Sequence, residues 1–249
     1  MGDVHGAYKP MLQCLERAGF DPKTDRLIQL GDVTDGGPDT YDCVEYLLNL
    51  PNCIALKGNH DDWLDEFITA GYHPGGWAHG GKATIQSYGK HLPKAPAIIP
   101  KSDGSCKTSL EPADIPASHQ QFFANQKLYF IDENNNCFVH AGFNRLLPFY
   151  TQPNRNYYWD RTLWNGAMAF VAENELQLEQ MQKTYQTDPA FNEIFIGHTP
   201  TTNWNTDQPM QRLNIWNIDT GASHQGRLTV MDVASKEYWQ SDIITGKTM

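Results

Sequence analysis

A chain of 249 residues with 40% hydrophobic residues can bury a large core, and its formal net charge is -10. This acidic balance argues against binding to a nucleic-acid backbone, because such proteins normally present a basic face. The five cysteines form no CxxC pair and indicate reduced thiols, and we find neither a signal peptide nor an apolar run of transmembrane length. We therefore expect one cytoplasmic domain over residues 1–249, without membrane contact.

Helices and strands are predicted to alternate over the first part of the chain. Apolar residues at helical spacing predict a helix over Lys9–Gly19. A strand over Leu27–Leu30, a helix over Thr40–Asn49, a strand over Ile54–Leu56 and a helix over Asp61–Ala70 follow. This order is typical of βαβ units and predicts a layered α/β fold.

The later part of the chain contains an insertion and a second set of strands. From Gly71 to Ser118 the composition shifts to Gly, Pro, Ser and Lys, which indicates a partly irregular cap insertion and not a separate domain. The other expected helices are Gln120–Gln126 and Ala167–Tyr185. The other expected strands are Lys127–Ile131, Cys137–His140, Ile194–Ile196, Leu213–Ile218, Arg227–Asp232 and Glu237–Ser241.

Residues that commonly bind metals recur where the predicted strands end. The segments are GDVHG (Asp3, His5), GDVTDGG (Asp32, Asp35), GNHDD (Asn59, His60), FVHAG (His140) and FIGHTP (His198). Their oxygen and nitrogen donors suit a pair of borderline divalent ions such as Mn²⁺, Fe²⁺ or Zn²⁺. Two ions bridged by a carboxylate can clamp an in-line displacement at phosphorus.

Each segment alone has a simpler interpretation. Asp3 and His5 could belong to an ordinary turn, and Asn59 could cap a helix. A lone histidine after an apolar run, such as His140 or His198, is usually a satisfied core residue. The occurrence of all five segments in order favours a dinuclear metal site.

The five segments, in this order, resemble the calcineurin-like metallophosphoesterases. The most similar branch contains phage and bacterial serine/threonine phosphatases and symmetrical diadenosine tetraphosphatases. The shared pattern is D-x-H, G-D-x-x-D, G-N-H-[D/E], H-A-G and G-H-T, and Asn217–Gly221 resembles part of the closing strands of that branch. The resemblance implies a four-layer α/β fold in which helices flank two packed β-sheets.

The resemblance also implies a metal centre and a general acid. Asp32 would bridge two ions, expected to be Mn²⁺ with Fe²⁺ or Zn²⁺ as alternatives, and a hydroxide shared by the ions would be the nucleophile. The implied ligands are Asp3 and His5 with Asp32 for the first ion, and Asn59, His140 and His198 with Asp32 for the second. His60 would protonate the leaving oxygen, oriented by Asp35. Asn59, His60 and Arg161 would contact the substrate.

The chain departs from this pattern at one position. The branch usually reads G-D-x-x-D-R-G, with an arginine that binds the phosphate, and Gly36 stands here instead. Because an arginine fork is a strong phosphate ligand, its loss leaves the choice of substrate open. Arg161 is expected to take over part of that role, and Arg145 is a second candidate.

Three functions therefore remain open. The first is hydrolysis of a phosphomonoester in the manner of a phosphoprotein phosphatase, and the second is symmetrical hydrolysis of a dinucleoside tetraphosphate. The third is a catalytically weak metal-binding protein that recognises a phosphorylated partner, which Gly36 favours and His60 with Asp35 disfavours. The expected partner is a phosphoprotein, a nucleotide or a small phosphoester. Four tryptophans could contact a substrate base, although core or rim packing is the simpler expectation: Trp77, Trp159, Trp164 and Trp204.

The first metal-binding turn has no strand before it. Only Met1 and Gly2 precede Asp3, whereas Asp32 and Asn59 each follow an apolar strand. We therefore expect the chain to be short at its N-terminus, with Met1 near the end of a truncated strand.

Overall fold

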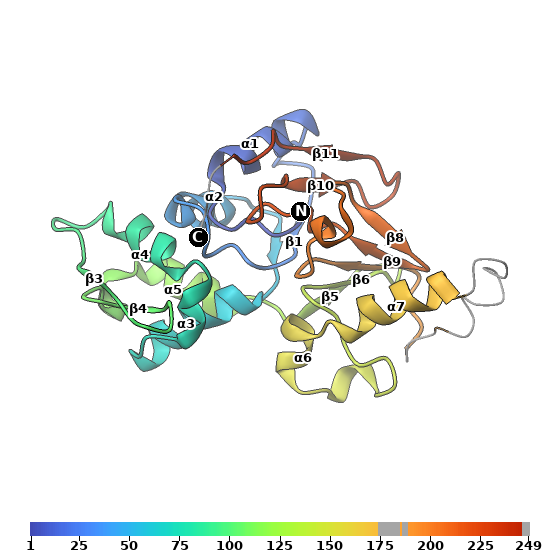
Figure 1. The fold of residues 1–249 in the computed structure, drawn as a ribbon. Helices are drawn as coiled ribbons and strands as arrows, with labels where there is room; N and C mark the ends of the chain where they lie inside the picture. Colours follow the sequence, from blue (N-terminus) through green and yellow to red (C-terminus); the bar gives the residue numbers. More distant parts are fainter. Residues whose placement is uncertain (174–184, 186–188, 246–249) are drawn as a thin grey trace.

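The computed structural model describes residues 1–173, 185 and 189–245, which form four layers of helices, strands, strands and helices (Figure 1). The expected α/β fold is thus confirmed. The helices are α1 (Tyr8–Arg17), α2 (Thr40–Leu48), α3 (Asn59–Ala70), α4 (Gly81–Gly89), α5 (Ala117–Asn125), α6 (Asn154–Trp159) and α7 (Thr162–Glu173). The strands are β1 (Leu27–Gln29), β2 (Cys53–Ala55), β3 (Ile98–Pro100), β4 (Cys106–Thr108), β5 (Tyr129–Ile131), β6 (Cys137–Val139), β7 (Ile194–Ile196), β8 (Met210–Arg212), β9 (Ile215–Asn217), β10 (Thr229–Met231) and β11 (Tyr238–Gln240). Within the described residues, no helix has the length and apolarity that a membrane span requires.

One β layer is a five-stranded sheet in the order β5-β6-β7-β9-β8. Its three inner strands are parallel, and each edge strand runs antiparallel to its neighbour. Because successive side chains point to opposite faces, Phe138 and Phe195 enter the core between the β layers. Val139 and Ile194 instead enter the core beneath α6 and α7. Both faces of β6 and β7 are therefore buried, which explains their continuous apolar sequence.

The other β layer combines two strand pairs with the first two residues of the chain. β1 and β2 are parallel, whereas β10 and β11 are antiparallel. Met1 lies beside β1: its amino group donates to the Ile28 carbonyl at 2.8 Å, and its carbonyl accepts from the Leu30 N–H at 3.0 Å. Gly2 donates to the Thr229 carbonyl of β10 at 3.0 Å. These residues link the two strand pairs, and Met1 also lines a neighbouring cavity of about 760 Å³.

The insertion expected over Gly71–Ser118 contains more regular structure than its composition predicts. It holds the 3-10 turn η1 (Gly75–His79), the helix α4 and the antiparallel hairpin β3–β4. α4 packs against α2, which belongs to the main domain. This packing stabilises helical structure that the glycine and proline content did not indicate. That the insertion acts as a cap remains a prediction.

Other expectations differ from the structure mainly at the ends of elements. The strand expected from Lys127 begins at Tyr129, because Lys127 pairs with Leu56 of the other layer. The strand expected from Leu213 begins later, since Leu213 has a φ of 54° in the turn between β8 and β9. The helix expected over Ala167–Tyr185 begins earlier, and most of its second half lies outside the described residues. Neither α6 nor β8 was expected.

Candidate active site

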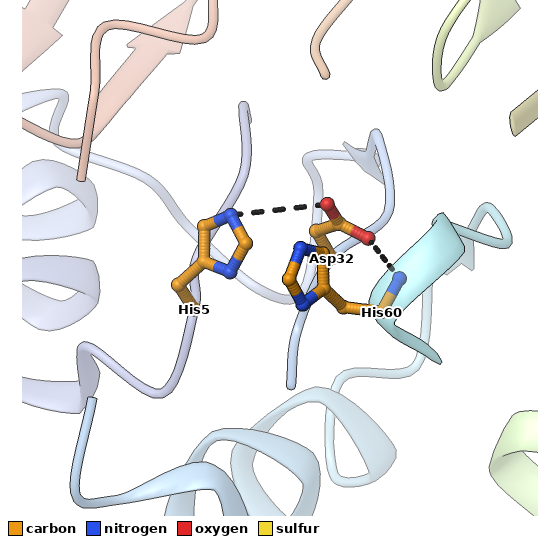
Figure 2. A group of neighbouring side chains, drawn as sticks. All are labelled: His5, Asp32 and His60. Carbon is orange, nitrogen blue, oxygen red and sulfur yellow. Dashed lines mark hydrogen bonds and ion pairs between the residues drawn. The ribbon is translucent and has the colours of Figure 1, made fainter. Parts of the chain in front are cut away.

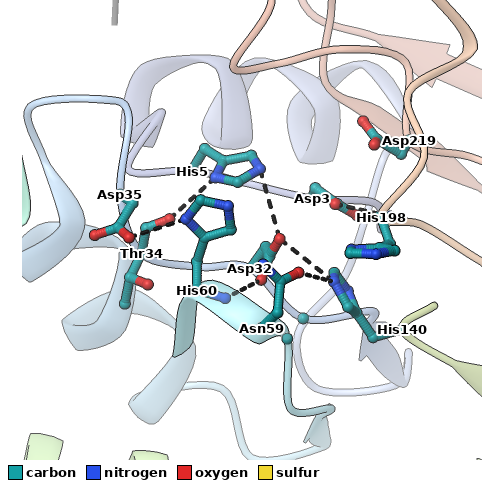
Figure 3. A network of polar contacts seen from close by, with 12 residues as sticks. Asp3, His5, Asp32, Thr34, Asp35, Asn59, His60, His140, His198 and Asp219 are labelled. Carbon is teal, nitrogen blue, oxygen red and sulfur yellow. Dashed lines mark hydrogen bonds and ion pairs between the residues drawn. The ribbon is translucent and has the colours of Figure 1, made fainter. Parts of the chain in front are cut away.

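The predicted site residues meet in one place (Figure 3). They lie beyond the C-terminal ends of parallel strands, the part of an α/β sheet where ligands commonly bind. The turn after β1 supplies Asp32 and Asp35, and the start of α3, after β2, supplies Asn59 and His60. The turns after β6 and β7 supply His140 and His198, and the N-terminal turn supplies Asp3 and His5.

Asp32 is common to two groups of side chains that could hold metal ions. Ligand atoms of His5, Asp32 and His60 all lie within 4.8 Å of one another, as do those of Asp32, His140 and His198. Figure 2 shows the first group, in which Asp32 Oδ2 lies 3.8 Å from His5 Nε2 and Oδ1 accepts from the His60 backbone N–H at 2.9 Å. Asp32 thus belongs to both groups, as a carboxylate that bridges two ions would.

The histidines are oriented as metal-binding histidines usually are. His5 Nδ1–H donates to the Thr34 carbonyl at 3.0 Å, and His140 Nδ1–H donates to the Leu30 carbonyl at 2.7 Å. These bonds leave the lone pair on Nε2, which is the usual consequence of a backbone partner on the other nitrogen. The Nε2 atom of His198 is buried and has no hydrogen-bond partner among the described residues.

Oxygen and nitrogen atoms of several side chains crowd together at the centre of the site. His140 Nε2 lies 3.2 Å from Asn59 Oδ1 and 3.3 Å from Asp32 Oδ2. Asp3 Oδ2 accepts from the His198 backbone N–H at 3.0 Å, but Asp3 Oδ1 is buried and unpartnered. Buried acceptors require a compensating donor or cation. The residues therefore fit bound divalent ions, and the mixed N and O donors suit Mn²⁺, Fe²⁺ or Zn²⁺.

Burial and neighbouring charges raise the pKa values of some site residues and lower those of others. Burial, followed by the nearby Asp219 and Asp32, raises the pKa of Asp3 well above its usual range. Burial raises the pKa of Asp219 to about 6 and lowers the pKa of His5 to about 4. Burial would also raise the pKa of Asp32, but His140 and other nearby histidines outweigh it and hold the pKa well below its usual value. Asp32 is therefore the ionised carboxylate at the centre of the site.

The His60 side chain is held by a carboxylate that is itself held in place. His60 Nδ1–H donates to Asp35 Oδ2 at 2.9 Å, and the Asp35 side chain is fully buried. Thr84, from α4 of the insertion, donates to Asp35 Oδ1 at 2.7 Å and accepts from the Asp35 N–H at 2.9 Å. Burial alone would lower the pKa of His60, but Asp32 and the bond to Asp35 raise it. Nε2 of this ring makes no hydrogen bond within the described residues.

The predicted substrate-binding residues line one cavity of about 550 Å³ together with Asp3, His5, Asp32 and His198, whereas His140 does not line it. Arg161 Nη1 donates to the His198 carbonyl at 3.0 Å and to Thr199 Oγ1 at 2.8 Å. Gly36 also lines this cavity. Arg145 does not, because its guanidinium lies over the Tyr185 ring, 4.4 Å from the centroid.

The sequence pattern did not place at the site several residues that the structure brings there. His79 and His224 also line the cavity. Trp159 lines it too, whereas Trp77 and Trp164 are buried in the core as expected. The buried Asp61 joins the second and third turns, because its carboxylate accepts from the N–H groups of Val33, Thr34 and Gly58 and from Gln126 Nε2. Only the position of Asp61 directly after the GNH motif could have indicated this role.

The backbone at the site is strained. Nine non-glycine residues among those described have a positive φ, and four of them are His5, Asp32, Asp35 and His198, at 48°, 54°, 65° and 67°. This region is unfavourable for residues with a Cβ and concentrates at functional sites. The strain therefore coincides with the residues that the sequence pattern singled out.

Comparison with known proteins supports one family. The sequence profile described as calcineurin-like phosphoesterase matches residues 1–219. A symmetrical bis(5'-nucleosyl)-tetraphosphatase of Erwinia tasmaniensis is 39% identical over 62 residues, 24% of this chain and 23% of that protein. Serine/threonine-protein phosphatase 2 of Escherichia coli is 31% identical over 132 residues, 49% of this chain and 60% of that protein. The chain thus spans less than two thirds of the length of these relatives.

Solved structures share the fold at low sequence identity. A crystal structure described as that of a candidate diadenosine tetraphosphatase aligns with a TM-score of 0.64 and 15% identity, over 98% of this chain and 92% of that chain. A metallophosphoesterase from Sphaerobacter thermophilus aligns with a TM-score of 0.55 and 16% identity, over 98% of this chain and 87% of that chain. Both likenesses extend over almost the whole chain and support the fold.

We expect the protein to bind close to two Mn²⁺ ions per chain after reconstitution and desalting, as measured by elemental analysis. His140→Ala and His198→Ala should each weaken binding of one ion by at least about 10–100-fold, the range seen when even a partner of a metal ligand is lost. His91→Ala is the matched control, because His91 is exposed and stacks on Tyr41 away from the site. Wild-type protein that retains no ion after reconstitution would refute the dinuclear assignment.

Proposed function

Because the chain belongs to the calcineurin-like phosphoesterase family, we propose that it hydrolyses phosphomonoesters with two divalent metal ions, as a phosphoprotein phosphatase does. The observation that carries this proposal is the hydrogen bond between His60 and the buried Asp35 beside the shared carboxylate of Asp32. A protein that only bound metal or phosphate would not need an oriented acid next to that carboxylate.

The metal ligands in this proposal are assigned from both sequence and geometry. Asp3, His5 and Asp32 would hold one ion, and the other would be held by Asp32, Asn59, His140 and His198. His60 also lies in the first group of ligand atoms, but its bond to Asp35 favours the role of an acid. Ions bound here would polarise the phosphoryl oxygens and lower the pKa of the attacking water.

His60 is proposed to protonate the leaving oxygen. The raised pKa of His60 favours the protonated ring, and the bond from Nδ1 to Asp35 leaves Nε2 to carry the transferable proton. Asp35 fixes the direction of the ring, and Thr84 fixes Asp35. This arrangement meets the geometric requirement for a general acid, which is reach to the leaving oxygen from a fixed position.

Arg161 is proposed to bind the phosphate in place of the arginine that Gly36 replaces. Its Nη1 is occupied by the carbonyl of His198 and the hydroxyl of Thr199, which anchors the side chain. The remaining guanidinium N–H groups make no hydrogen bond within the described residues and can form charge-assisted bonds to phosphate oxygens. Asn59 lines the same cavity and would supply a neutral contact.

Symmetrical hydrolysis of a dinucleoside tetraphosphate is the second candidate, because several relatives carry the name of that activity. The two functions share the chemistry at phosphorus and differ in the group beyond the leaving oxygen. Initial rates of Mn²⁺-loaded protein with p-nitrophenyl phosphate, a phosphopeptide and diadenosine tetraphosphate test both. If the protein hydrolysed none of these three substrates, the enzymatic proposal would be refuted.

We expect His60→Asn to keep metal content and fold but to lower kcat by roughly 10²–10⁴, the usual contribution of a general acid. The loss should be larger for alkyl phosphates than for p-nitrophenyl phosphate, since a good leaving group needs little protonation. Asp35→Asn should lower kcat less, because it only positions the ring. An equal loss on both kinds of substrate would argue against the acid role of His60.

Gly36→Arg should destabilise the protein. Gly36 has a φ of 87°, although a Cβ there would meet only ordinary contacts, 3.4 Å from His5 Cβ and 3.6 Å from Ser223 Cβ. A residue with a Cβ in a left-handed conformation costs about 1–2 kcal/mol. Denaturant unfolding should therefore show a lower free energy of unfolding by about that amount, and an unchanged value would contradict the strain at this turn.

A further inference from the structure

Helix α3 presents an aromatic side chain next to the proposed general acid. Trp63 lies three residues after His60, and residues at this spacing share one face of a helix. The two rings meet edge to face, with centroids 4.6 Å apart. Trp63 is half-buried and lines the active-site cavity. An apolar ring thus borders the place where the leaving oxygen must receive its proton.

A second tryptophan faces the first from another element. Trp159, at the end of α6, lies 5.6 Å from the Trp63 ring and 6.0 Å from the ring of His198. The guanidinium of Arg155, one helical turn earlier, lies over the Trp159 ring at 5.0 Å from its centroid. Trp159 and Arg155 both line the cavity. The two indoles therefore form an aromatic wall that extends from the proposed acid to a proposed metal ligand.

The position of Trp63 is fixed by the insertion. A Cβ built on Gly76 would lie 2.0 Å from Cε2 of the indole, so only glycine allows the chain to pass this close to the ring. The His79 ring stacks on the Trp63 ring, with the two centroids 6.0 Å apart and an interplanar angle of 21°. These contacts hold the ring in place before any ligand enters, which reduces the entropy lost on binding.

We propose that Trp63 and Trp159 form a subsite for an aromatic leaving group, so that the preferred substrates are aryl phosphomonoesters such as phosphotyrosine. This proposal rests on the function proposed above. A general acid must lie within about 3 Å of the leaving oxygen, and the atoms bonded to that oxygen then lie against the indole that borders His60. A phenol places its ring there. The base of a dinucleoside polyphosphate does not, because a ribose and at least one phosphate separate it from the broken bond.

The proposed reaction is ordinary hydrolysis. Water adds its oxygen to phosphorus, and the bond from phosphorus to the phenol oxygen breaks with its electron pair left on that oxygen. His60 donates a proton to the oxygen and regains one from solvent, which also receives the proton lost by the water. The products are a phenol and inorganic phosphate.

The kinetic test compares the same substrates across variants, so that the intrinsic reactivity of each substrate cancels. Mn²⁺-loaded wild-type protein, Trp63→Leu and Trp159→Leu are assayed with phenyl phosphate and phosphotyrosine, and with ethyl phosphate and phosphoserine. The Leu variants should lower kcat/KM for the aryl substrates about tenfold or more and for the alkyl substrates less than about threefold, as expected for lost aromatic contacts. Trp239→Leu is the control, since Trp239 is half-buried on β11 and does not line this cavity. Equal losses on both substrate pairs, or no loss, would overturn the proposal.

A binding test separates the subsite from the enzymatic function. Calorimetry with Mn²⁺-loaded protein should show phenylphosphonate binding about tenfold more tightly than methylphosphonate, and Trp63→Leu should remove most of the difference. Selective phosphonate binding without hydrolysis of any phosphoester would refute the proposed function and keep the subsite. Hydrolysis without selective binding would refute the subsite and keep the function. If Trp63→Leu lowered kcat/KM for diadenosine tetraphosphate alone and not for the aryl phosphates, the aryl subsite would also be refuted, in favour of a nucleobase site.

Discussion

The whole site depends on the position of one buried residue, Asp32. Its backbone carbonyl accepts from the N–H groups of Val4 and His5 at 3.0 and 2.8 Å, which attaches the N-terminal turn to the turn after β1. Its side chain accepts from the N–H of His60, which attaches the start of α3. The same carboxylate belongs to both groups of metal-ligand candidates. One residue therefore sets the geometry of three turns, and a shift of Asp32 would disturb both proposed ion positions together.

The buried carboxylates of the site differ in the number of hydrogen-bond donors that they contact. Asp61 accepts four hydrogen bonds from neighbouring loops and thus has the partners that a buried charge needs. Asp3 lies near Asp219 and has an unpartnered oxygen. Removing water from such a pair favours neutral carboxyl groups unless a cation is present. The contrast separates a carboxylate that holds loops together from carboxylates arranged to receive positive charge.

The sequence predicted most of the side chains that meet at the candidate site, because ligand-type residues follow the strand ends along the chain. It could not predict contacts between distant segments, such as the bonds from Thr84 of the insertion to Asp35. It also could not assign the φ of Gly36, which depends on how two turns meet. Apolar periodicity predicted a layered α/β fold, and the family resemblance implied its four layers. The elements β8, α6 and the insertion hairpin were missed, since short strands and packing against neighbours leave weak local signals. Trp63 was within reach of sequence reasoning, because it follows His60 at helical spacing.

The residues at the site come from two parts of the chain, which have different roles. The N-terminal turn and the turns that follow the central strands supply the proposed metal ligands, the acid His60 and its partner Asp35, and four of these residues adopt an unfavourable positive φ. Packed sheets on either side must hold that strain, because short turns alone would relax. The insertion instead supplies contacts that support other side chains: Thr84 on Asp35, and Gly76 on Trp63. Changes in the insertion would therefore alter the leaving-group side of the cavity and the orientation of the acid, while the strand-end ligands stay in place.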